Sequence, residues 1–279
     1  MPELPEVEAV AQALRPLIEG ETIVRCRVIH PVVLHTSPGG ARNRAAAHLV
    51  RRLRGEKVRA VGRRGKYLIV ELQHGSLILH FRFDGQLIWF DSRKISGHVD
   101  VALETRHGTL GFLDPRHLGR VQWAVRPEDV PGIRTLGVEP FSREFTEGRL
   151  MEMLRASGQP LKQFLLDQRK VAGIGNIYSS EALWRARLDP RRRASRLTGE
   201  EAHRLHKSIV DVLYRALECC AARLRIFATR SGGSMGWSAF CVFMDARGRV
   251  AGAVASRCGG SSKGVARHFS ARDASISAH

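Results

Sequence analysis

The sequence predicts an α+β protein, in which an N-terminal β-sandwich with a leading helix precedes an all-α region. Between residues 21 and 125, short runs rich in β-branched and aromatic residues are separated by glycine, His-Gly and Asp-Gly turns, a pattern typical of strands. A stretch with three prolines follows at 125–141, and beyond it the apolar residues recur with the period of a helix. At 279 residues the chain is long enough for two domains with separate cores.

The N-terminal domain is predicted to cover residues 1–130 and to begin with a helix over residues 6–18. The strands predicted after it cover residues 22–29, 58–63, 67–72, 76–83, 86–90, 98–104 and 121–125. Because these runs are short and regularly spaced, they favour an antiparallel sandwich or barrel.

The second half of the chain is predicted to be helical. Thr198 and Glu201 form a capping box, the pattern in which the two residues close the first turn of a helix. Helices are predicted over residues 150–156, 161–168, 176–188 and 202–218. After Glu218 neither a helical nor a strand period is sustained. We therefore predict a helical domain over residues 131–217 and a tail of different character over 218–279.

The chain is strongly basic, with 45 lysine and arginine residues against 27 aspartate and glutamate residues and a net charge of +18. A charge of this size favours a polyanionic partner, because binding to phosphates releases condensed counterions. An anionic membrane is less favoured, because the sequence contains no evident basic amphipathic helix. Nucleic acid is therefore the predicted partner, although a merely arginine-rich surface is the simpler alternative.

The N-terminal residues MPELPEVEAV carry acids where a signal peptide has basic residues and an apolar run. No segment is apolar and long enough to cross a membrane, and we predict a cytoplasmic protein that does not bind membranes. The five cysteines are Cys26, Cys219, Cys220, Cys241 and Cys258. None of them forms a C-x2-C pair, so the chain as written offers no zinc site of that type and no predicted metal ligand.

The first residues, MPELPEVE, suggest a nucleophile. If Met1 is removed, Pro2 becomes an N-terminal secondary amine, whose pKa near 8 leaves an unprotonated fraction at neutral pH. Attack of this amine on an aldehydic carbon would give an iminium, which permits elimination at the neighbouring carbon. Glu3 and Glu6 are candidates for the proton transfers. The alternative is that proline at position 2 merely permits removal of Met1.

Four motifs in order give the chain a close resemblance to the bacterial formamidopyrimidine-DNA glycosylases. They are the start MPELPEVE, the hairpin RRGKYLIVEL, the segment LDPRHLGRVQW and the run VAGIGNIYSSEAL. The last resembles the helix–two-turns–helix signature with which this family grips DNA. The resemblance covers residues 1–217 and implies that the second domain has the helix–two-turns–helix fold.

The resemblance implies a monomeric base-excision repair enzyme that flips an oxidised purine out of damaged double-stranded DNA. Pro2 would attack C1′ of the deoxyribose, Glu3 would handle protons at the sugar, and Lys66 would act in base loss and elimination. Glu6 would support them. Two alternatives remain open, an endonuclease VIII-like preference for oxidised pyrimidines and a DNA-binding protein without catalysis.

The resemblance also implies DNA contacts. Lys162 and Asn176 correspond to residues that contact phosphates around the flipped nucleotide. Phe83, Arg116 and Leu118 correspond to the wedge that fills the space left by the base. Here Phe83 replaces the usual methionine and Leu118 the usual phenylalanine, and ordinary packing is the alternative for both. Arg116 would face the orphaned base.

The tail departs from the family, which ends in a hairpin that holds a structural zinc through C-x2-C-x16-C-x2-C. The genetic code allows a test of a shifted reading frame, in which the third base of each codon is read together with the first two bases of the next codon. In that frame, residues 270–275 can encode the family's usual C-P-R-C-Q. In the same phase, residues 250–254 can encode a C-x2-C pair sixteen residues earlier. We therefore predict a shifted reading frame that begins between Leu217 and Ile226. As written, the chain uses no cofactor, and its activity is expected to be weakened.

Overall fold

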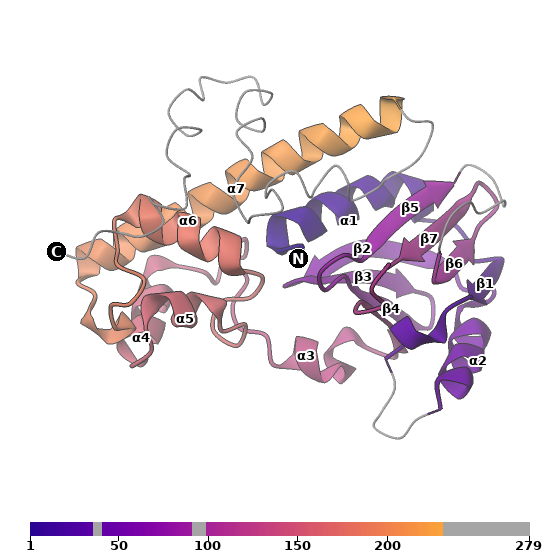
Figure 1. The fold of residues 1–279 in the computed structure, drawn as a ribbon, viewed down its shortest axis with the longest axis horizontal. Coiled ribbons are helices and arrows are strands. Elements are labelled where there is room, and N and C mark those ends of the chain that lie inside the picture. The colour runs from indigo at the N-terminus through magenta and orange to yellow at the C-terminus, as the bar shows by residue number, and fades with distance from the viewer. Residues whose placement is uncertain (36–40, 91–98, 231–279) are drawn as a thin grey trace. The chain divides into compact units, whose positions relative to one another are not determined.

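A computed structural model describes residues 1–35, 41–90 and 99–230, with side chains up to Cys220. It contains two compact units, Met1–Arg134 and Thr135–Ala222 (Figure 1). The first unit combines strands with helices and the described part of the second is helical, which confirms the predicted α+β class. None of the described helices is long and apolar enough to cross a membrane.

The N-terminal unit contains two antiparallel sheets of four strands each, with the orders β1-β6-β7-β5 and β2-β3-β4-β8. The strands are β1 (Arg25–Val28), β2 (Val58–Arg64), β3 (Tyr67–Leu72), β4 (Gly75–His80), β5 (Gln86–Phe90), β6 (Val101–Glu104), β7 (Thr109–Leu113) and β8 (Arg120–Ala124). Strands β2, β3 and β4 pair with their sequence neighbours, as expected of short antiparallel strands joined by tight turns. The two separate sheets correspond to the predicted sandwich rather than to a closed barrel.

Helix α1 (Leu4–Ile18) carries the N-terminus along strand β2, with which it is in contact. Its apolar face buries Leu4, Val7 and Leu14 completely. The helix starts two residues before the predicted start, because Leu4 and Pro5 occupy its first turn, where a proline needs no hydrogen-bond partner for its nitrogen. Burial of this face fixes the N-terminus of the protein at one end of β2 and β3.

Several elements of the N-terminal unit were not predicted. Helix α2 (Arg42–Leu53) buries only Leu49 and Leu53, and its large apolar residues are confined to its second half. Strand β7 contains Gly111, where a β-carbon would come within 3.1 Å of Phe90 and 3.2 Å of Val99. A glycine weakens the strand signal, although the close packing at this position requires it. Two 3-10 turns, Pro31–Val33 and Pro127–Asp129, and the short helix α3 (Pro131–Arg134) complete the unit.

The second unit is built from helices around one apolar core. They are α4 (Glu147–Arg155), α5 (Leu161–Leu166), α6 (Asn176–Ala186) and α7 (Gly199–Arg230), with a 3-10 turn at Ala194–Arg196. Leu150, Leu161 and Phe164 are completely buried in the core. Spacings of three and four residues place the apolar side chains of each helix on one face, as the sequence predicts.

The capping box at the start of α7 is confirmed. The backbone N–H of Glu201 donates to the Thr198 hydroxyl at 3.3 Å, and that of Thr198 donates to the Glu201 carboxylate at 2.9 Å. The Arg192 guanidinium also binds this carboxylate and, with these bonds, lowers the pKa of Glu201 to about 2. The helix continues past the predicted end at residue 218 to Arg230, through alanine, leucine and arginine, which favour helices.

Candidate active site and nucleic-acid interface

Three charged residues are buried near the start of α1. Glu3, Glu6 and Lys66 are exposed by only 2%, 6% and 8%, which is unusual for ionisable side chains. The backbone N–H of Glu3 donates to the Glu6 carboxylate at 2.9 Å, so the two acids are held in the first turn. Lys66 lies in the turn between β2 and β3, directly after Gly65, whose φ of +58° suits a tight hairpin.

The electrostatics of Lys66 follow from its surroundings. Burial lowers the pKa of this lysine, because an ammonium ion loses hydration there, while the charges of Glu3 and Glu6 raise it. Burial is the larger effect, so the net pKa lies below the ordinary value for lysine. A lysine in this state gives up a proton more readily than a solvated one. The fold thus brings Lys66 within the electrostatic influence of Glu3 and Glu6. Pro2 directly precedes Glu3 in the chain.

His80 is a site residue that the sequence analysis missed. It ends strand β4 opposite Tyr67, the residue after Lys66, and the Tyr67 and His80 rings meet edge to face at 4.6 Å. The backbone N–H of Arg82 donates to Nδ1 of His80 at 3.1 Å. Burial and, to a smaller extent, the nearby cations Arg82 and Lys66 lower the pKa of His80 to about 4. No sequence pattern singled out His80, because its position opposite the lysine hairpin follows from the pairing of β3 with β4.

The lowered pKa of His80 predicts an acid-sensitive fold. In the unfolded chain a histidine takes up a proton near pH 6.5, whereas His80 in the folded protein does so only near pH 4. The unfolded state therefore binds more protons between these values, and stability falls as the pH is lowered from about 6.5 to about 4. The expected loss is on the order of 3 kcal/mol.

Urea denaturation at a series of pH values would measure this loss. His80→Gln, which keeps a polar side chain but does not titrate, should remove most of the pH dependence in this range. His203→Gln, a change at an exposed histidine on α7, is the matched control and should leave the dependence in place. A His80→Gln profile that parallels that of the natural protein would contradict the prediction.

The three predicted wedge residues lie on two loops of the N-terminal unit. Phe83 and Leu118 are large apolar side chains with exposures of 53% and 39%. The Arg116 guanidinium lies over the Phe83 ring, 5.3 Å from its centroid, and pairs with Asp84. Phe83 and Arg116 are therefore brought together, and Leu118 follows two residues later on the same loop as Arg116. Their exposure argues against the alternative of ordinary core packing.

Asp114 holds the loop that carries Arg116 and Leu118 through two hydrogen bonds. One carboxylate oxygen of Asp114 accepts from the backbone N–H of Arg116 at 3.1 Å, and the other accepts from that of Gly119. Within this turn, His117 has a φ of +53°, which is uncommon for a residue other than glycine. A backbone in this conformation persists only where its surroundings hold it.

Asp100 supplies that support. Its carboxylate is only 2% exposed and accepts from the backbone N–H of Asp114 at 2.6 Å. Nδ1 of His30 and Nδ1 of His117 approach the other carboxylate oxygen at 3.0 Å and 2.9 Å. Two histidines on one buried carboxylate therefore tie the Arg116 loop to the end of β1. No sequence pattern indicated this network, because its members are far apart in the chain.

Replacement of Asp100 by asparagine is expected to loosen this loop. The amide group is the same size, but its NH2 must face either the Asp114 N–H or the two histidines, and donors are left unpaired. The expected loss of stability is about 3 kcal/mol. Asp129→Asn, at an exposed acid paired with Arg126, should change stability much less than Asp100→Asn. Urea denaturation of both variants checks the prediction, and equal losses would contradict it.

In the second unit, the glycine loop before α6 brings Lys162 and Asn176 together. Nζ of Lys162 donates to the backbone carbonyl of Asn176 at 2.9 Å and also to the Ser180 hydroxyl. Asn176 is exposed at the first position of α6, and Gly175, the capping residue, provides no side-chain cap. The positive end of this helix therefore lies beside the Asn176 amide, an arrangement that suits a phosphate.

Gln168 is a further residue that the sequence analysis missed. Its amide group donates to the carbonyl of Ile174 at 2.7 Å and accepts from the N–H of Gly173 at 2.9 Å. Gly173 has a φ of +87°, which a residue with a side chain would rarely adopt. Gln168 thus fixes the glycine loop from the side of α5, and it positions the start of α6.

Comparison with known proteins identifies both units. Residues 1–121 match the family model for the formamidopyrimidine-DNA glycosylase N-terminal domain. Residues 136–228 match that for the formamidopyrimidine-DNA glycosylase H2TH domain.

The chain belongs to the formamidopyrimidine-DNA glycosylase family.

Relatives in the family cover most of the chain. The formamidopyrimidine-DNA glycosylase of Thermus thermophilus is 41% identical over 222 residues, 78% of this chain and 76% of the relative. That of Pelotomaculum thermopropionicum is 35% identical over 266 residues, 93% of this chain and 92% of the relative. A solved complex between the Lactococcus lactis family member and DNA containing an abasic site has a TM-score of 0.69 and 32% identity, covering 78% of this chain and 79% of that one.

The structural zinc of the family does not fit the residues described here. In the described part of the chain, no three histidine, cysteine, aspartate or glutamate side chains gather as a metal site requires. Cys26 is buried, and burial raises the pKa of its thiol to about 12, which disfavours a metal-binding thiolate. Cys241, Cys258 and the residues whose shifted codons would encode the zinc ligands, 250–254 and 270–275, lie outside the described residues.

Proposed function

We propose that the protein is a bifunctional DNA glycosylase and AP lyase that removes oxidised purines, chiefly 8-oxoguanine and formamidopyrimidines, from duplex DNA. The observation that carries this proposal is the burial of Lys66 within the electrostatic influence of Glu3 and Glu6, where Glu3 directly follows Pro2 in the chain. Family membership supports DNA repair as the setting.

The proposed first step is displacement at the sugar. After removal of Met1, the Pro2 nitrogen attacks C1′ and its proton passes through Lys66 to the base, which leaves as the bond from C1′ to the base breaks. Glu3 protonates the ring oxygen as the sugar opens, which gives an iminium between Pro2 and C1′. Lys66, whose pKa is lowered by burial, exchanges protons with the base and the sugar.

The proposed second step is elimination. Lys66 takes a proton from C2′, and its electron pair moves into the iminium to give an enamine. The enamine expels the 3′ phosphate with the C3′–O bond electrons, which leaves a conjugated iminium. A second elimination, with loss of the C4′ proton to water, releases the 5′ phosphate, and water then frees Pro2. Glu6 holds Glu3 through its N–H and keeps the acids in place.

The proposed DNA contacts follow from exposure and shape. Phe83 and Leu118 are free to enter the space left by the flipped base, while Arg116 exchanges its pairing with Asp84 for the orphaned base. The start of α6, with Asn176 and Lys162, would bind a phosphate of the damaged strand. We propose a monomeric, cytoplasmic protein that acts on damaged double-stranded DNA.

A damaged-base panel tests the substrate assignment. Duplexes that each contain 8-oxoguanine, a formamidopyrimidine or an oxidised pyrimidine are incubated with the protein, and base release is measured separately from strand cleavage. Faster release of the purines supports the proposal, whereas faster release of the oxidised pyrimidine favours the endonuclease VIII-like alternative. Binding to all duplexes without release would indicate a DNA-binding protein that lacks catalysis.

A further inference from the structure

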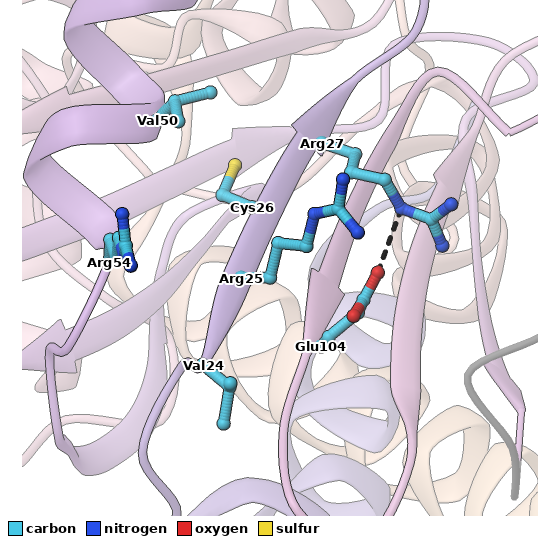
Figure 2. Close-up of a pocket in the computed structure, with 7 residues that line it drawn as sticks. All are labelled: Val24, Arg25, Cys26, Arg27, Val50, Arg54 and Glu104. Carbon is cyan, nitrogen blue, oxygen red and sulfur yellow. Dashed lines mark ion pairs between the residues drawn. The ribbon is translucent and has the colours of Figure 1, made fainter.

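A hollow of about 510 Å³ lies at the edge strand β1 and the end of α2. Figure 2 shows Arg25 and Arg27 extending from one side of β1, with Val50 and Arg54 across Cys26 on the other side. Val24, which is 43% exposed, and Glu104 complete the lining. The hollow therefore combines three guanidinium groups with two aliphatic side chains.

The charges of the hollow are poorly balanced. Its one acid, Glu104, has an 8% exposed side chain and pairs with Nε of Arg27 at 2.8 Å (Figure 2). Arg25 and Arg54 are exposed, and in the described part of the chain no acid pairs with either. The nearest acids in the sequence are already occupied, since Glu21 binds His107 and Glu56 binds His74. Two unpaired guanidinium groups thus remain at the hollow.

Helix α2 extends the basic surface beyond the hollow. The helix contains no acidic residue, and its exposed arginines are Arg42, Arg44, Arg51 and Arg52. Arg51 and Arg52 lie in its last turn, where positive charge suits the helix dipole. Arg42 and Arg44 lie in its first turn, so the dipole accounts for only part of this pattern. A row of arginines that leads from α2 to β1 matches a ligand with several negative charges.

The hollow is remote from the catalytic cluster within the same unit. Arg54 precedes β2, and the adjoining Gly55 is hydrogen-bonded to Ile23 next to β1, whereas Lys66 follows the other end of β2. The seven residues of β2 separate these two ends by roughly 20 Å at about 3.3 Å per residue. Salt at physiological concentration screens charges over about 8 Å, so the two sites act independently.

We propose that this hollow, with the arginines of α2, is a second DNA-binding site that takes the phosphodiester backbone of an undamaged duplex segment. One guanidinium group can donate two parallel hydrogen bonds to the oxygens of one phosphate. The aliphatic Val24 and Val50 suit contact with the sugars between successive phosphates. No base-reading geometry is involved, so the site is not sequence-specific. An enzyme with two such sites holds one segment while it captures the next, which shortens its search for rare lesions.

The test compares four proteins. Arg25→Gln/Arg54→Gln removes both unpaired charges from the hollow, and Asn176→Ala alters the lesion side. Arg126→Gln/Arg149→Gln is the matched control, because it removes two exposed arginines that are paired with acids. Binding of an undamaged duplex of roughly one helical turn is measured by fluorescence anisotropy over a range of salt concentrations, and the number of bound duplexes by native mass spectrometry.

The proposal expects two bound duplexes at low salt for the natural protein and one for Arg25→Gln/Arg54→Gln. The slope of log affinity against log salt should fall by about 2 in that variant, because each lost phosphate contact lowers it by about 0.9. Asn176→Ala and the control should retain binding at the hollow. Borohydride trapping on a short abasic-site duplex should be unchanged by the Arg25 and Arg54 substitutions.

Three results would overturn the proposal. These are a single bound duplex for the natural protein, a salt slope of Arg25→Gln/Arg54→Gln equal to that of the control, or a parallel loss of trapping, which would assign these arginines to the lesion-binding surface. Circular dichroism confirms that each variant is folded. Because the ligand is undamaged DNA, absence of base release in the panel above would leave this result intact.

Discussion

Replacement of Pro2 by glycine is expected to reduce borohydride trapping on an abasic-site duplex by about 100-fold, the cost of a misplaced nucleophile. Proline contributes a secondary amine on a rigid ring, directly before the Glu3 that begins α1. Glycine leaves a primary amine on a flexible backbone, so the amine spends little time in reach of C1′. Because Glu3 remains fixed through Glu6, the fold should survive the change.

Two comparisons make the Pro2 test decisive. Protein that retains Met1 has the same folded sequence, but its Pro2 nitrogen is an amide without nucleophilic character, and mass spectrometry distinguishes the two forms. This protein should not be trapped. Lys66→Gln should reduce release of an intact damaged base more strongly than trapping at an abasic site, where the base is already absent. Equal trapping by Pro2→Gly and by the natural protein would refute the role of Pro2.

The strands of the N-terminal unit could be predicted because their apolar residues repeat locally. Strand β3 was predicted with the observed bounds, since YLIVEL combines β-branched residues with a glycine turn on its N-terminal side. Helix α2 was harder to predict, because only Leu49 and Leu53 are buried. Arginine and alanine make up most of its sequence, so large apolar residues mark the helical spacing only in its second half.

The candidate site shows the same division. Pro2, Glu3 and Lys66 were suggested by the chemistry of an N-terminal proline and by the family resemblance. The support of Arg116 by Asp100 could not be found this way, because His30, Asp100 and His117 meet only through the pairing of β1, β6 and β7. The role of Gln168 likewise depends on the folded path of the glycine loop.

Sequencing of the encoding DNA is expected to show thymine at the third positions of the codons for Val250, Ala253, Ser270 and Asp273. Each of these thymines, joined to the next two bases, completes a cysteine codon in the shifted phase. The resulting spacing of two C-x2-C pairs, sixteen residues apart, is typical of a tetrahedral zinc site. Another base at any of the four positions would refute the frameshift.

Restoration of the frame should change the protein more than any single substitution. A one-nucleotide correction between the codons for Leu217 and Ile226 replaces the end of the chain and supplies four thiolates, so the purified protein should contain one zinc per chain. Metal analysis measures this directly, without reference to activity. Since structural zinc contributes folding energy, chelation should destabilise the restored protein and leave the chain as written unaffected. Zinc-free restored protein would show that the cysteine spacing arose by chance. Tighter binding to lesion-containing DNA by the restored protein than by the chain as written would show that the tail limits DNA binding.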